Sequence, residues 1–363
     1  MKIAYITSSL EGGGAQLPIP AVTRVLRNSG AEVKIFALTR RDGRALPSIL
    51  EDGLPINIRE GGDYDHWNAY KWLEQEIINY EPTLIWTSVA RASILGIFLG
   101  GKYSIPVVCW QHNAYLKLSR QILFYCLRKQ PVMWIGDSDI VSNLTAKRFK
   151  VPTERMATWP LFAANPDAPQ AKAWKQGQIF RIGSLGRLNP QKSYDQLIKA
   201  LVILKKRCNT SKIKFEIIVA GDGKLHKSLT KKAQQAGCKE LQFIGFTEDP
   251  QNFLASLHLY LQCSNLEGFC ISVHEAMQAS LPIISTSVGQ IPYTIESGVN
   301  GWLVPPNNAE ALANALTAAV AKPEQLAKMG KAARAKVLSL YSKQLFCKSG
   351  ERIIHRLEQA GIC

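Results

Sequence analysis

The sequence predicts an α/β protein of two domains, each with a parallel sheet covered by helices. Three observations support this prediction. At 363 residues the chain exceeds what one hydrophobic core usually serves. Short apolar runs alternate with helical patterns along most of the chain, which is typical of βαβ units. Residues 163–178 are rich in Pro and Ala, lack periodicity and separate two such series, as a linker does.

The composition is that of an ordinary globular protein, with 46% hydrophobic and 20% charged residues. No apolar run approaches the length of a membrane span, and the N-terminal apolar segment is too short for a signal peptide. We therefore expect the protein to remain in the cytoplasm. The eight cysteines form no C-x-x-C pair, so we expect them to be reduced, with no disulfide and no zinc site.

The net charge of +16 is unevenly distributed. Residues 1–163 carry 19 basic and 14 acidic side chains, a net +5, which leaves +11 for the remainder. Such a chain attracts polyanions. No nucleic-acid-binding motif accompanies the charge, so we expect an anionic membrane surface and diphosphate ligands as partners, and no nucleic acid.

In the first domain, a glycine loop separates the first strand from a helical stretch that runs to about Asn28. Backbone N–H groups at Gly12, Gly13 and Gly14 could cradle a phosphate, although a plain tight turn explains the triplet equally well. Pro18 and Pro20 suit a first helical turn. The remaining pattern predicts strands at residues 2–7, 32–38, 83–87, 106–110 and 132–136, and helices at 66–80, 92–99 and 140–149.

His112 follows the strand at 106–110, at its carboxyl end, where ligands bind in parallel folds. A lone histidine is more often structural, but this position favours contact with a ligand. Two Asp-x-Asp sequences are better explained without a metal. Asp137 and Asp139 bracket the start of a helix and suit capping, and Asp63 with Asp65 is a loop doublet of the kind that chance supplies.

Residues 116–129 interleave apolar side chains with Lys and Arg. The pattern fits a basic amphipathic helix on an anionic membrane, and it also fits a helix whose apolar face packs on the domain core. The two interpretations are compatible, because a basic flank can touch lipid headgroups while an apolar stripe packs inward.

The second domain opens with a strand, a glycine loop and a helix. Arg187 and Lys192 stand five apart in that loop, and Ser184 and Gly186 line it. A guanidinium fork and an ammonium so placed can bind one diphosphate. The pattern predicts strands at residues 180–185, 215–220, 241–246, 257–261 and 282–285, and helices at 194–204, 271–279 and 338–357.

Residues 264–306 contain the most informative stretch. Glu267 lies with Gly268 in the loop after a buried strand, and Glu275 lies about one turn into the next helix. The helix start supplies unpaired backbone N–H groups for an anion, at Phe269, Cys270 and Ile271. Carboxylates beside an anion site suit a ligand that also carries hydroxyls, and a nucleotide diphosphate sugar has both features.

This stretch resembles the donor-site signature of the retaining glycosyltransferases with the GT-B fold, specifically glycosyltransferase family 4. The resemblance rests on two glutamates separated by seven residues, a Glu-Ala-Met, a Pro that opens a strand, and a distal Gly-Trp-Leu-Val-Pro-Pro. The chain departs from the family at Cys270 and Leu281, where Gly is usual, and after Gly289, where a Gly-Gly-x-x-Glu run is usual. These departures leave the sugar specificity open.

The resemblance implies two Rossmann-like domains facing across a cleft. The acceptor domain would span residues 1–162 and the nucleotide-sugar domain residues 179–340, with a C-terminal helix in 341–363 packing back on the first. In the family, the cations grip the diphosphate, the second glutamate binds ribose and the first binds the sugar. The implied catalytic residues are His112, Glu267, Arg187 and Lys192, and the implied donor-binding residues are Gly13, Gly14, Ser184, Gly186, Arg187, Lys192, Glu267, Gly268, Phe269, Cys270, Ile271 and Glu275.

The activity so implied is transfer of a hexosyl unit, with retention of configuration, from a nucleotide diphosphate sugar, with UDP favoured, to a glycan or lipid-linked acceptor. No metal and no cofactor beyond the co-substrate is expected. The context would be surface polysaccharide or lipopolysaccharide biosynthesis, with the protein peripheral on the inner face of the cytoplasmic membrane. A nucleotide-sugar epimerase of the same fold and a non-catalytic basic surface-binding protein remain as alternatives.

Overall fold

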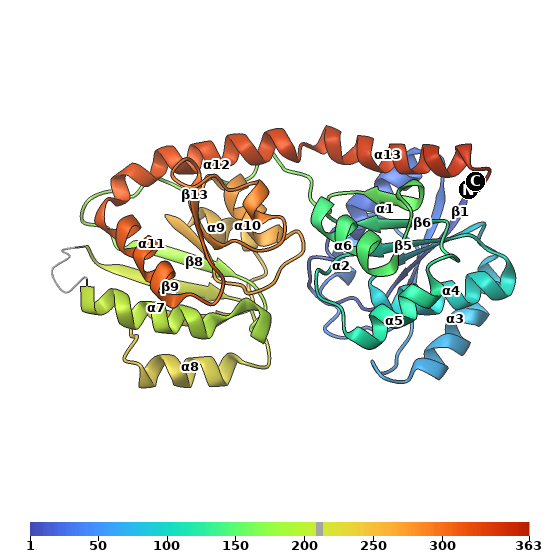
Figure 1. Cartoon of the computed structure of the whole chain (residues 1–363), viewed down its shortest axis with the longest axis horizontal. Coiled ribbons are helices and arrows are strands. Elements are labelled where there is room, and N and C mark those ends of the chain that lie inside the picture. The colour runs from blue at the N-terminus through green and yellow to red at the C-terminus, as the bar shows by residue number, and fades with distance from the viewer. Residues whose placement is uncertain (208–212, 363) are drawn as a thin grey trace. The chain divides into compact units, whose positions relative to one another are not determined.

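The chain folds into two compact units, each of which contains one parallel sheet. This computed structural model describes residues 1–207 and 213–362. Unit 1 comprises Met1–Phe162 together with Gln344–Cys363, and unit 2 comprises Ala163–Lys343 (Figure 1). The predicted α/β class, with parallel sheets and helices alternating along the chain, is confirmed.

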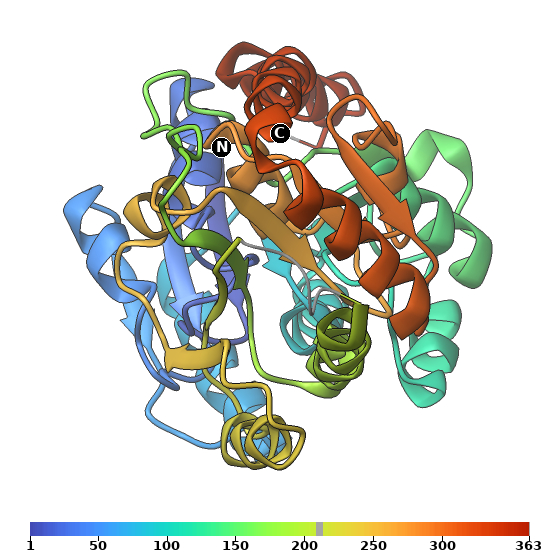
Figure 2. The ribbon, with the colours of Figure 1, turned by 90° about the vertical axis from the view of Figure 1, so that its left-hand side faces the viewer.

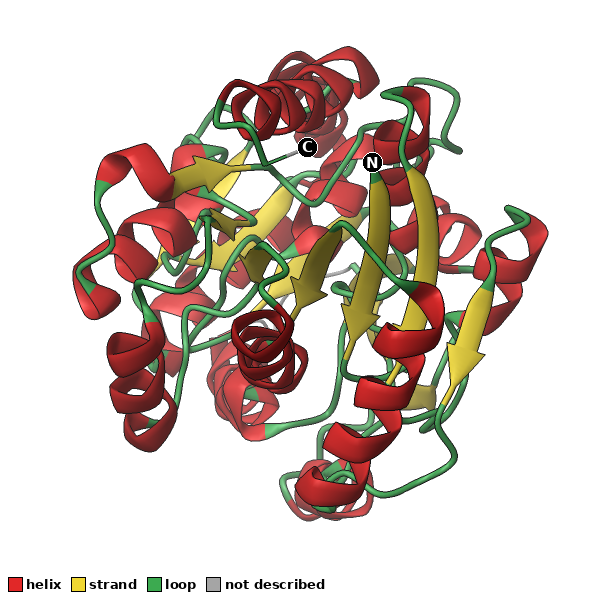
Figure 3. Ribbon diagram, turned by 90° about the vertical axis from the view of Figure 1, so that its right-hand side faces the viewer, coloured by secondary structure: helices red, strands yellow, loops and turns green. Residues whose placement is uncertain are grey.

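Among the described residues, unit 1 has a seven-stranded sheet in the order β3-β2-β1-β4-β5-β6-β7, all parallel. Figure 3 shows these strands between layers of helices. The strands are β1 (Lys2–Thr7), β2 (Glu32–Ala37), β3 (Ile56–Ile58), β4 (Leu84–Ser88), β5 (Val107–Gln111), β6 (Met133–Gly136) and β7 (Met156–Thr158).

Two cores hold the helices of unit 1 against its sheet. On one face, Phe124, Trp134 and Phe149 pack together with side chains of the neighbouring helices. On the other, Trp159 stacks on Trp110 and contacts Phe346 near the C-terminus. The helices are α1 (Ile19–Asn28), α2 (Leu46–Glu51), α3 (His66–Tyr80), α4 (Ala90–Tyr103), α5 (Leu118–Leu127), α6 (Asp139–Phe149) and α13 (Lys343–Gln359), with a 3-10 turn η1 (Thr153–Arg155).

Unit 2 has a parallel sheet in the order β10-β9-β8-β11-β12-β13 in the part of the chain that the structure describes. Figure 2 views this unit and shows helices on both sides of the strands. The strands are β8 (Phe180–Leu185), β9 (Phe215–Ala220), β10 (Leu241–Gly245), β11 (Leu259–Gln262), β12 (Ile283–Thr286) and β13 (Gly301–Val304).

One core of unit 2 joins its strands to the surrounding helices, through buried side chains such as Leu201, Leu229 and Leu316. The helices are α7 (Tyr194–Arg207), α8 (His226–Gln235), α9 (Pro250–Ala255), α10 (Ile271–Gln278), α11 (Ala309–Ala321) and α12 (Leu326–Leu340). The 3-10 turns are η2 (Pro190–Lys192), η3 (Ile291–Tyr293) and η4 (Pro323–Gln325).

In each sheet the order of the strands reverses at one point, between β1 and β4 in unit 1 and between β8 and β11 in unit 2. Loops that leave neighbouring strands in opposite directions open a crevice there, at the carboxyl ends. In unit 2 that position is occupied by the loops that follow Leu185 and Gln262. These loops carry most of the candidate donor-site residues.

The structure adds elements that were not predicted, among them β13, α2, α8, α9 and α11, and it differs from the predictions at other places. Strands β3 and β7, of three residues each, were not predicted, because a strand so short carries no periodic signal. The final helix expected at residues 338–357 is two helices, since α12 ends at Leu340 and its C-cap Tyr341 has φ −129° and ψ 37°. Helix α1 begins at Ile19, with Pro18 and Pro20 at its start, as predicted.

No helix among the described residues is long and apolar enough to cross a membrane. The described cysteines Cys109, Cys126, Cys238, Cys263, Cys270 and Cys347 are free thiols, whereas Cys208 and Cys363 lie outside the described residues.

Candidate functional site

The candidate site of unit 2 begins in the loop after β8, where Lys192 folds back over Gly186. A Cβ atom on Gly186 would lie 3.1 Å from Cε of Lys192 and 3.4 Å from the hydroxyl of Tyr194. Ser184, at the end of β8, is buried and its Oγ lies 3.2 Å from the same hydroxyl. The absence of a side chain at 186 therefore lets Lys192 lie along the strand end.

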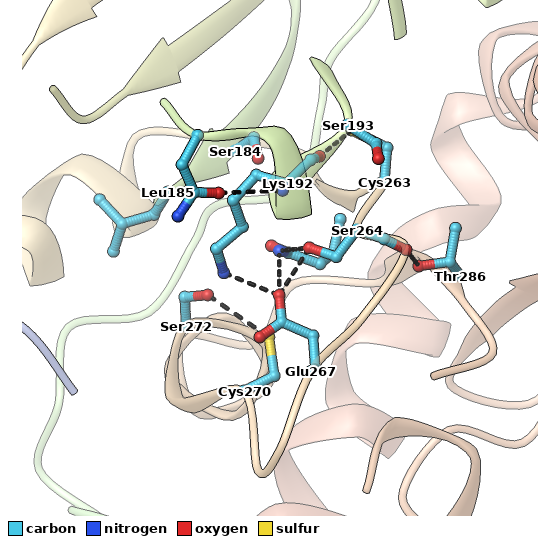
Figure 4. A network of polar contacts seen from close by, with 12 residues as sticks. Ser184, Leu185, Lys192, Ser193, Cys263, Ser264, Glu267, Cys270, Ser272 and Thr286 are labelled. Atoms are coloured by element: carbon cyan, nitrogen blue, oxygen red, sulfur yellow. Dashed lines mark hydrogen bonds and ion pairs between the residues drawn. The ribbon is translucent and has the colours of Figure 1, made fainter. Parts of the chain in front are cut away.

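Lys192 forms an ion pair with Glu267, from the loop after β11. Its Nζ lies 2.8 Å from Oε1 of Glu267, and the two side chains are 17% and 12% exposed (Figure 4). Burial by itself would lower the pKa of Lys192, but the charge and hydrogen bond of Glu267 outweigh it and raise that pKa above its usual value. Lys192 is therefore a permanent cation at the switch point.

Two neutral donors also hold Glu267 in place. Ser264 Oγ donates to Oε1 at 2.5 Å and Gln262 Nε2 donates to the same oxygen at 3.1 Å. Gln262 is itself fixed, since Tyr260 donates to its side-chain oxygen at 2.9 Å. An ammonium has three N–H donors. Lys192 can thus bind a second anion while Ser264 and Gln262 keep Glu267 oriented.

Helix α10 starts beside this pair, and its first turn is held rigidly. Cys270 occupies the left-handed region, with φ 65° and ψ 69°, and its carbonyl lies 2.9 Å from Nδ1 of His274. The His274 ring stacks on Phe269 with the centroids 4.1 Å apart. Gly289 closes against the preceding loop, because a Cβ there would lie 2.4 Å from the carbonyl oxygen of Gly268. The amides that open α10, near Ile271, lack intrahelical acceptors, as at any helix start.

Glu275 lies in the second turn of α10 and is half-buried. Burial raises the pKa of its carboxyl group to about 7. Its carboxylate makes no hydrogen bond or ion pair with any residue that the structure describes. A partly buried acceptor without a protein partner is suited to receive hydrogen bonds from a ligand.

The structure does not bring all predicted residues of unit 2 into one cluster. Lys192, Glu267 and Gly186 meet directly. Arg187, by contrast, is exposed at the rim of the loop.

His112 lies in unit 1, just beyond β5, and is 8% exposed. Its Nε2 lies 2.8 Å from Ser88 Oγ, and its Nδ1 lies 4.0 Å from Oδ2 of Asp137. Burial lowers the pKa of His112 to about 3, so the imidazole is neutral at neutral pH. With Ser88 as donor to Nε2, the proton is on Nδ1, which has no hydrogen-bond partner among the described residues.

The glycine loop of unit 1 uses some of its amides internally. Gly12 N–H donates to Asp42 Oδ1 at 3.1 Å, and Gly13 N–H donates to the carbonyl of Glu11 at 2.8 Å. Gly14 is exposed. The structure thus has a compact turn here, which is one of the two interpretations of the glycine triplet.

The two Asp-x-Asp sequences have other partners. Asp65 pairs with Arg59 and Arg91, and Asp63 pairs with Arg41 at 3.0 Å. In the second sequence the helix cap is Ser138, whose hydroxyl accepts from Val141 N–H at 3.3 Å. Over residues 1–207 and 213–362, no group of three or more His, Cys, Asp or Glu side chains could hold a metal ion.

Sequence reasoning missed four residues that shape these sites. Gln262 and Ser264 orient Glu267, and Ser88 and Asp137 flank His112. Gln262 and Ser88 are polar residues at the last position of buried strands. That position, at the carboxyl end of a parallel strand, was the available signal.

Comparison with known proteins finds sequence similarity to glycosyltransferases, mainly in unit 2. The family model described as Glycosyl transferases group 1 matches residues 167–336. The chain is 29% identical over 189 residues to the amylovoran biosynthesis glycosyltransferase AmsK of Erwinia amylovora, covering 50% of this chain and 46% of AmsK. It is 27% identical over 209 residues to the putative colanic acid biosynthesis glycosyltransferase WcaL of Salmonella typhimurium, covering 54% and 50%. The chain thus spans about half the length of these curated relatives.

Solved structures match the whole chain. The complex of HepE from Anabaena with UDP and glucose aligns with a TM-score of 0.83 at 18% identity, covering 99% of this chain and 100% of HepE. The sucrose-phosphate synthase of Thermosynechococcus elongatus aligns with a TM-score of 0.79 at 16% identity, covering 99% and 100%. The chain therefore has the GT-B fold, as predicted.

Proposed function

We propose that this chain, whose residues 167–336 match the model of the glycosyl transferases group 1, transfers a hexosyl unit from a nucleotide diphosphate sugar to a glycan or lipid-linked acceptor. The anomeric configuration is retained, and UDP is the favoured nucleotide. The process served is assembly of a surface polysaccharide or lipopolysaccharide. The protein acts at the cytoplasmic side of the membrane, as a peripheral protein.

The observation that carries the proposal is the Lys192–Glu267 pair at the switch point of the unit 2 sheet. It places a permanent cation and a fixed hydroxyl acceptor within 2.8 Å of each other, next to the first amides of α10. A diphosphate needs the cation and the amides, and the sugar joined to it needs the carboxylate. A nucleotide diphosphate sugar satisfies all three groups at once.

The residues have distinct roles in the proposed reaction. Lys192 and Arg187 stabilise the charge that develops on the departing diphosphate, which is the main electrostatic requirement of the transition state. Because protein cations fill this role, no divalent cation is needed. Glu267 binds hydroxyls of the transferred sugar and Glu275 binds those of the ribose. His112 contacts the transferred sugar, and Gly13 and Gly14 form part of the donor site.

The named relatives support this choice of substrate class. AmsK and WcaL are named for the biosynthesis of amylovoran and colanic acid, which places both in polysaccharide assembly. HepE was solved with UDP and with UDP-glucose. The net charge of +16 suits a protein that meets anionic donors and an anionic membrane surface.

A thermal-shift screen tests the donor site. Purified protein is melted with UDP, GDP or ADP, each with and without EDTA. A ligand that binds only the folded state raises the melting temperature. We expect one nucleotide, UDP, to stabilise the protein equally with and without EDTA, and the variants Glu275→Ala and Lys192→Ala to lose this response. Glu324→Gln, an exposed carboxylate in a 3-10 turn of the same unit, is the matched control.

Incubation with the nucleotide sugar that stabilises the protein then separates the enzyme classes. Transfer requires an acceptor, whereas an epimerase would convert the donor sugar without one. If no nucleotide stabilises the protein, or if Glu275→Ala responds like wild type, the donor-site assignment is wrong and a non-catalytic surface-binding role replaces it.

A further inference from the structure

We infer that the outward face of α5 in unit 1 docks on an anionic lipid bilayer. The inference rests on contacts within unit 1 and stands apart from the transfer reaction. It also specifies the surface by which the proposed peripheral association would occur, and to that extent it builds on the proposed function.

The inward face of helix α5 packs on the core of unit 1. Phe124 is fully buried and contacts Trp134 edge-on, at 5.5 Å between ring centroids, and Leu127 is buried beside it. The packing of α5 on the domain core, one of the two interpretations of this segment, is therefore confirmed. That packing leaves the other apolar side chains of the helix unexplained.

Those remaining side chains form a stripe that faces solvent. Leu118, Ile122 and Tyr125 are 71%, 57% and 36% exposed, and they follow the spacing i, i+4, i+7 that places residues on one helix face. Tyr115, just before the helix, is 53% exposed. Single exposed apolar residues are ordinary, but a helix that is apolar on two opposite faces has a second surface to cover.

Cations surround the stripe. Lys117, Arg120 and Lys129 are exposed on or next to α5. The guanidinium of Arg128 lies 4.1 Å from the centroid of the Tyr125 ring. No carboxylate occurs anywhere from residue 82 to residue 136, so nothing in α4, β5 or α5 itself neutralises these charges.

The exposed apolar stripe and the cations around it together indicate which partner binds this surface. A second copy of the chain would bring the same cations against themselves, which opposes association through this face. An anionic bilayer accepts both components. Leu118 and Ile122 enter the boundary between headgroups and acyl chains, the tyrosine ring sits at headgroup level, and the long basic side chains reach the phosphates.

Docking in this way would serve a lipid-linked acceptor. The loop that leads from β5 into α5 carries His112, so the start of the helix and the candidate sugar-contacting histidine lie within six residues of each other in the chain. A bilayer against α5 thus holds an acceptor headgroup near the carboxyl ends of the unit 1 strands.

Vesicle co-sedimentation tests the inference. We expect the protein to bind vesicles of phosphatidylglycerol mixed with phosphatidylcholine, and to bind pure phosphatidylcholine at least tenfold more weakly. Leu118→Ser with Ile122→Ser should weaken binding to the anionic vesicles by tenfold or more. Lys117→Gln, Arg120→Gln and Lys129→Gln together should weaken it about a hundredfold, at about fivefold for each cation near the surface.

Matched controls separate this surface from the net charge of the chain. Leu50→Ser with Val299→Ser removes apolar side chains that are 57% and 48% exposed elsewhere. Lys227→Gln, Lys231→Gln and Lys239→Gln remove three exposed charges from unit 2. Both control proteins should bind as wild type does. Equal losses in control and α5 variants, or no binding by wild type, would overturn the inference, as would a wild-type dimer that only the α5 variants abolish.

A second measurement needs no change in the stripe. Cys126 is an exposed thiol on α5 and can carry an environment-sensitive fluorophore, in a background with Cys347→Ser and Cys363→Ser. Anionic vesicles should shift its emission to the blue. An unchanged emission in the presence of vesicles that sediment the protein would place the membrane contact elsewhere. The thermal response to UDP, measured on the same variants, should be unaffected, so failure of docking and failure of the donor site are distinguishable.

Discussion

Lys192 and Glu267 stand 75 residues apart in the chain and meet with Nζ and Oε1 2.8 Å apart, at the one point where the strand order of the described unit 2 sheet reverses. Other residues hold both side chains in position. Lys192 is held over Gly186, and Glu267 is held by two neutral donors. The pair is therefore formed by its surroundings before any ligand arrives, as a preorganised binding site requires.

A double-mutant cycle should measure this coupling. Lys192→Met and Glu267→Gln each remove one partner of a largely buried pair, and each should lower the free energy of unfolding by about 1–3 kcal/mol. The double variant should lose less than the sum, with a coupling energy of about 0.5–3 kcal/mol in urea unfolding. The Arg181–Glu216 pair, in which the arginine side chain is 48% exposed, is the control and should show less than about 1 kcal/mol. Equal couplings in both pairs would contradict a special role for the buried one.

Glu275 should make nucleotide binding pH-dependent. Burial raises the pKa of its carboxyl group to about 7, and only the deprotonated form accepts hydrogen bonds from both ribose hydroxyls. Affinity for the nucleotide should fall as the pH drops from 8 to 6, by about tenfold per pH unit below the pKa at most. Titration calorimetry on Glu275→Gln should show weaker binding without this pH dependence. A parallel pH dependence in the variant would assign the titration to another group.

The same group affects stability with a definite sign. Because the folded-state pKa of Glu275 lies above its unfolded value, the folded state binds the extra proton between about pH 4.5 and 7, and stability falls as the pH rises through that window. Glu275→Gln should therefore gain stability relative to wild type above pH 7. Urea unfolding at pH 5 and pH 8 checks the sign, since the difference between variant and wild type should be larger at pH 8.

His112 should remain neutral well below its usual pKa. Burial lowers its pKa to about 3. Below about pH 6.5 the unfolded chain therefore binds a proton at His112 that the folded chain does not bind, and the stability of the folded state falls as the pH drops below 6.5. In a histidine NMR titration, the His112 resonances should not move above pH 5. Ser88→Ala removes the partner of Nε2 and should cost about 1–3 kcal/mol. A midpoint near pH 6.5 would show that the ring is solvated.

Gly350 should be required for the C-terminal helix to pack. A Cβ there would lie 2.5 Å from Cζ2 of Trp159, a distance that forces the helix or the ring to shift. Gly350→Ala should therefore destabilise unit 1 by about 1–3 kcal/mol, within the range measured for overpacked cores. Glu351→Ala, the next residue and exposed, should be neutral or slightly stabilising. Tryptophan fluorescence during urea unfolding checks both, and equal stability of the two variants would contradict the packing.

The sequence predicted the regular parts of the fold well because their signal is local. Apolar runs such as Phe180–Leu185 and Phe215–Ala220 were predicted with the bounds that the structure has. The strand Ile56–Ile58 gave no signal, since its residues are all half-buried at the edge of the sheet. The break at Tyr341 was equally hidden. The Tyr341 carbonyl accepts a hydrogen bond from Ala164 N–H, a contact across 177 positions that no local pattern encodes.

The candidate site shows the same limit. Its charged residues could be predicted because loops after strands of a parallel sheet face one edge. The supporting donors Gln262 and Ser264 could not, since their importance lies in distances of 3.1 and 2.5 Å to one oxygen of Glu267. The strong burial of His112 was not predicted for the same reason. A residue just after a strand can line an open crevice or be covered by neighbouring side chains, and the sequence does not distinguish the two.

Unit 1 is discontinuous in the chain, and this has a consequence for how the protein is made. Residues 1–162 leave the ribosome before unit 2, but the helix that covers Trp159 is synthesised only after unit 2. Unit 2, by contrast, is one uninterrupted stretch. During translation the later unit can therefore complete its core while the earlier one still exposes the apolar surface that Phe346 and Ile353 will bury. Unit 1 thus begins to form before unit 2 but is completed after it. Until α13 has been synthesised, the exposed apolar surface of unit 1 is the part of the nascent chain that most needs protection by a chaperone.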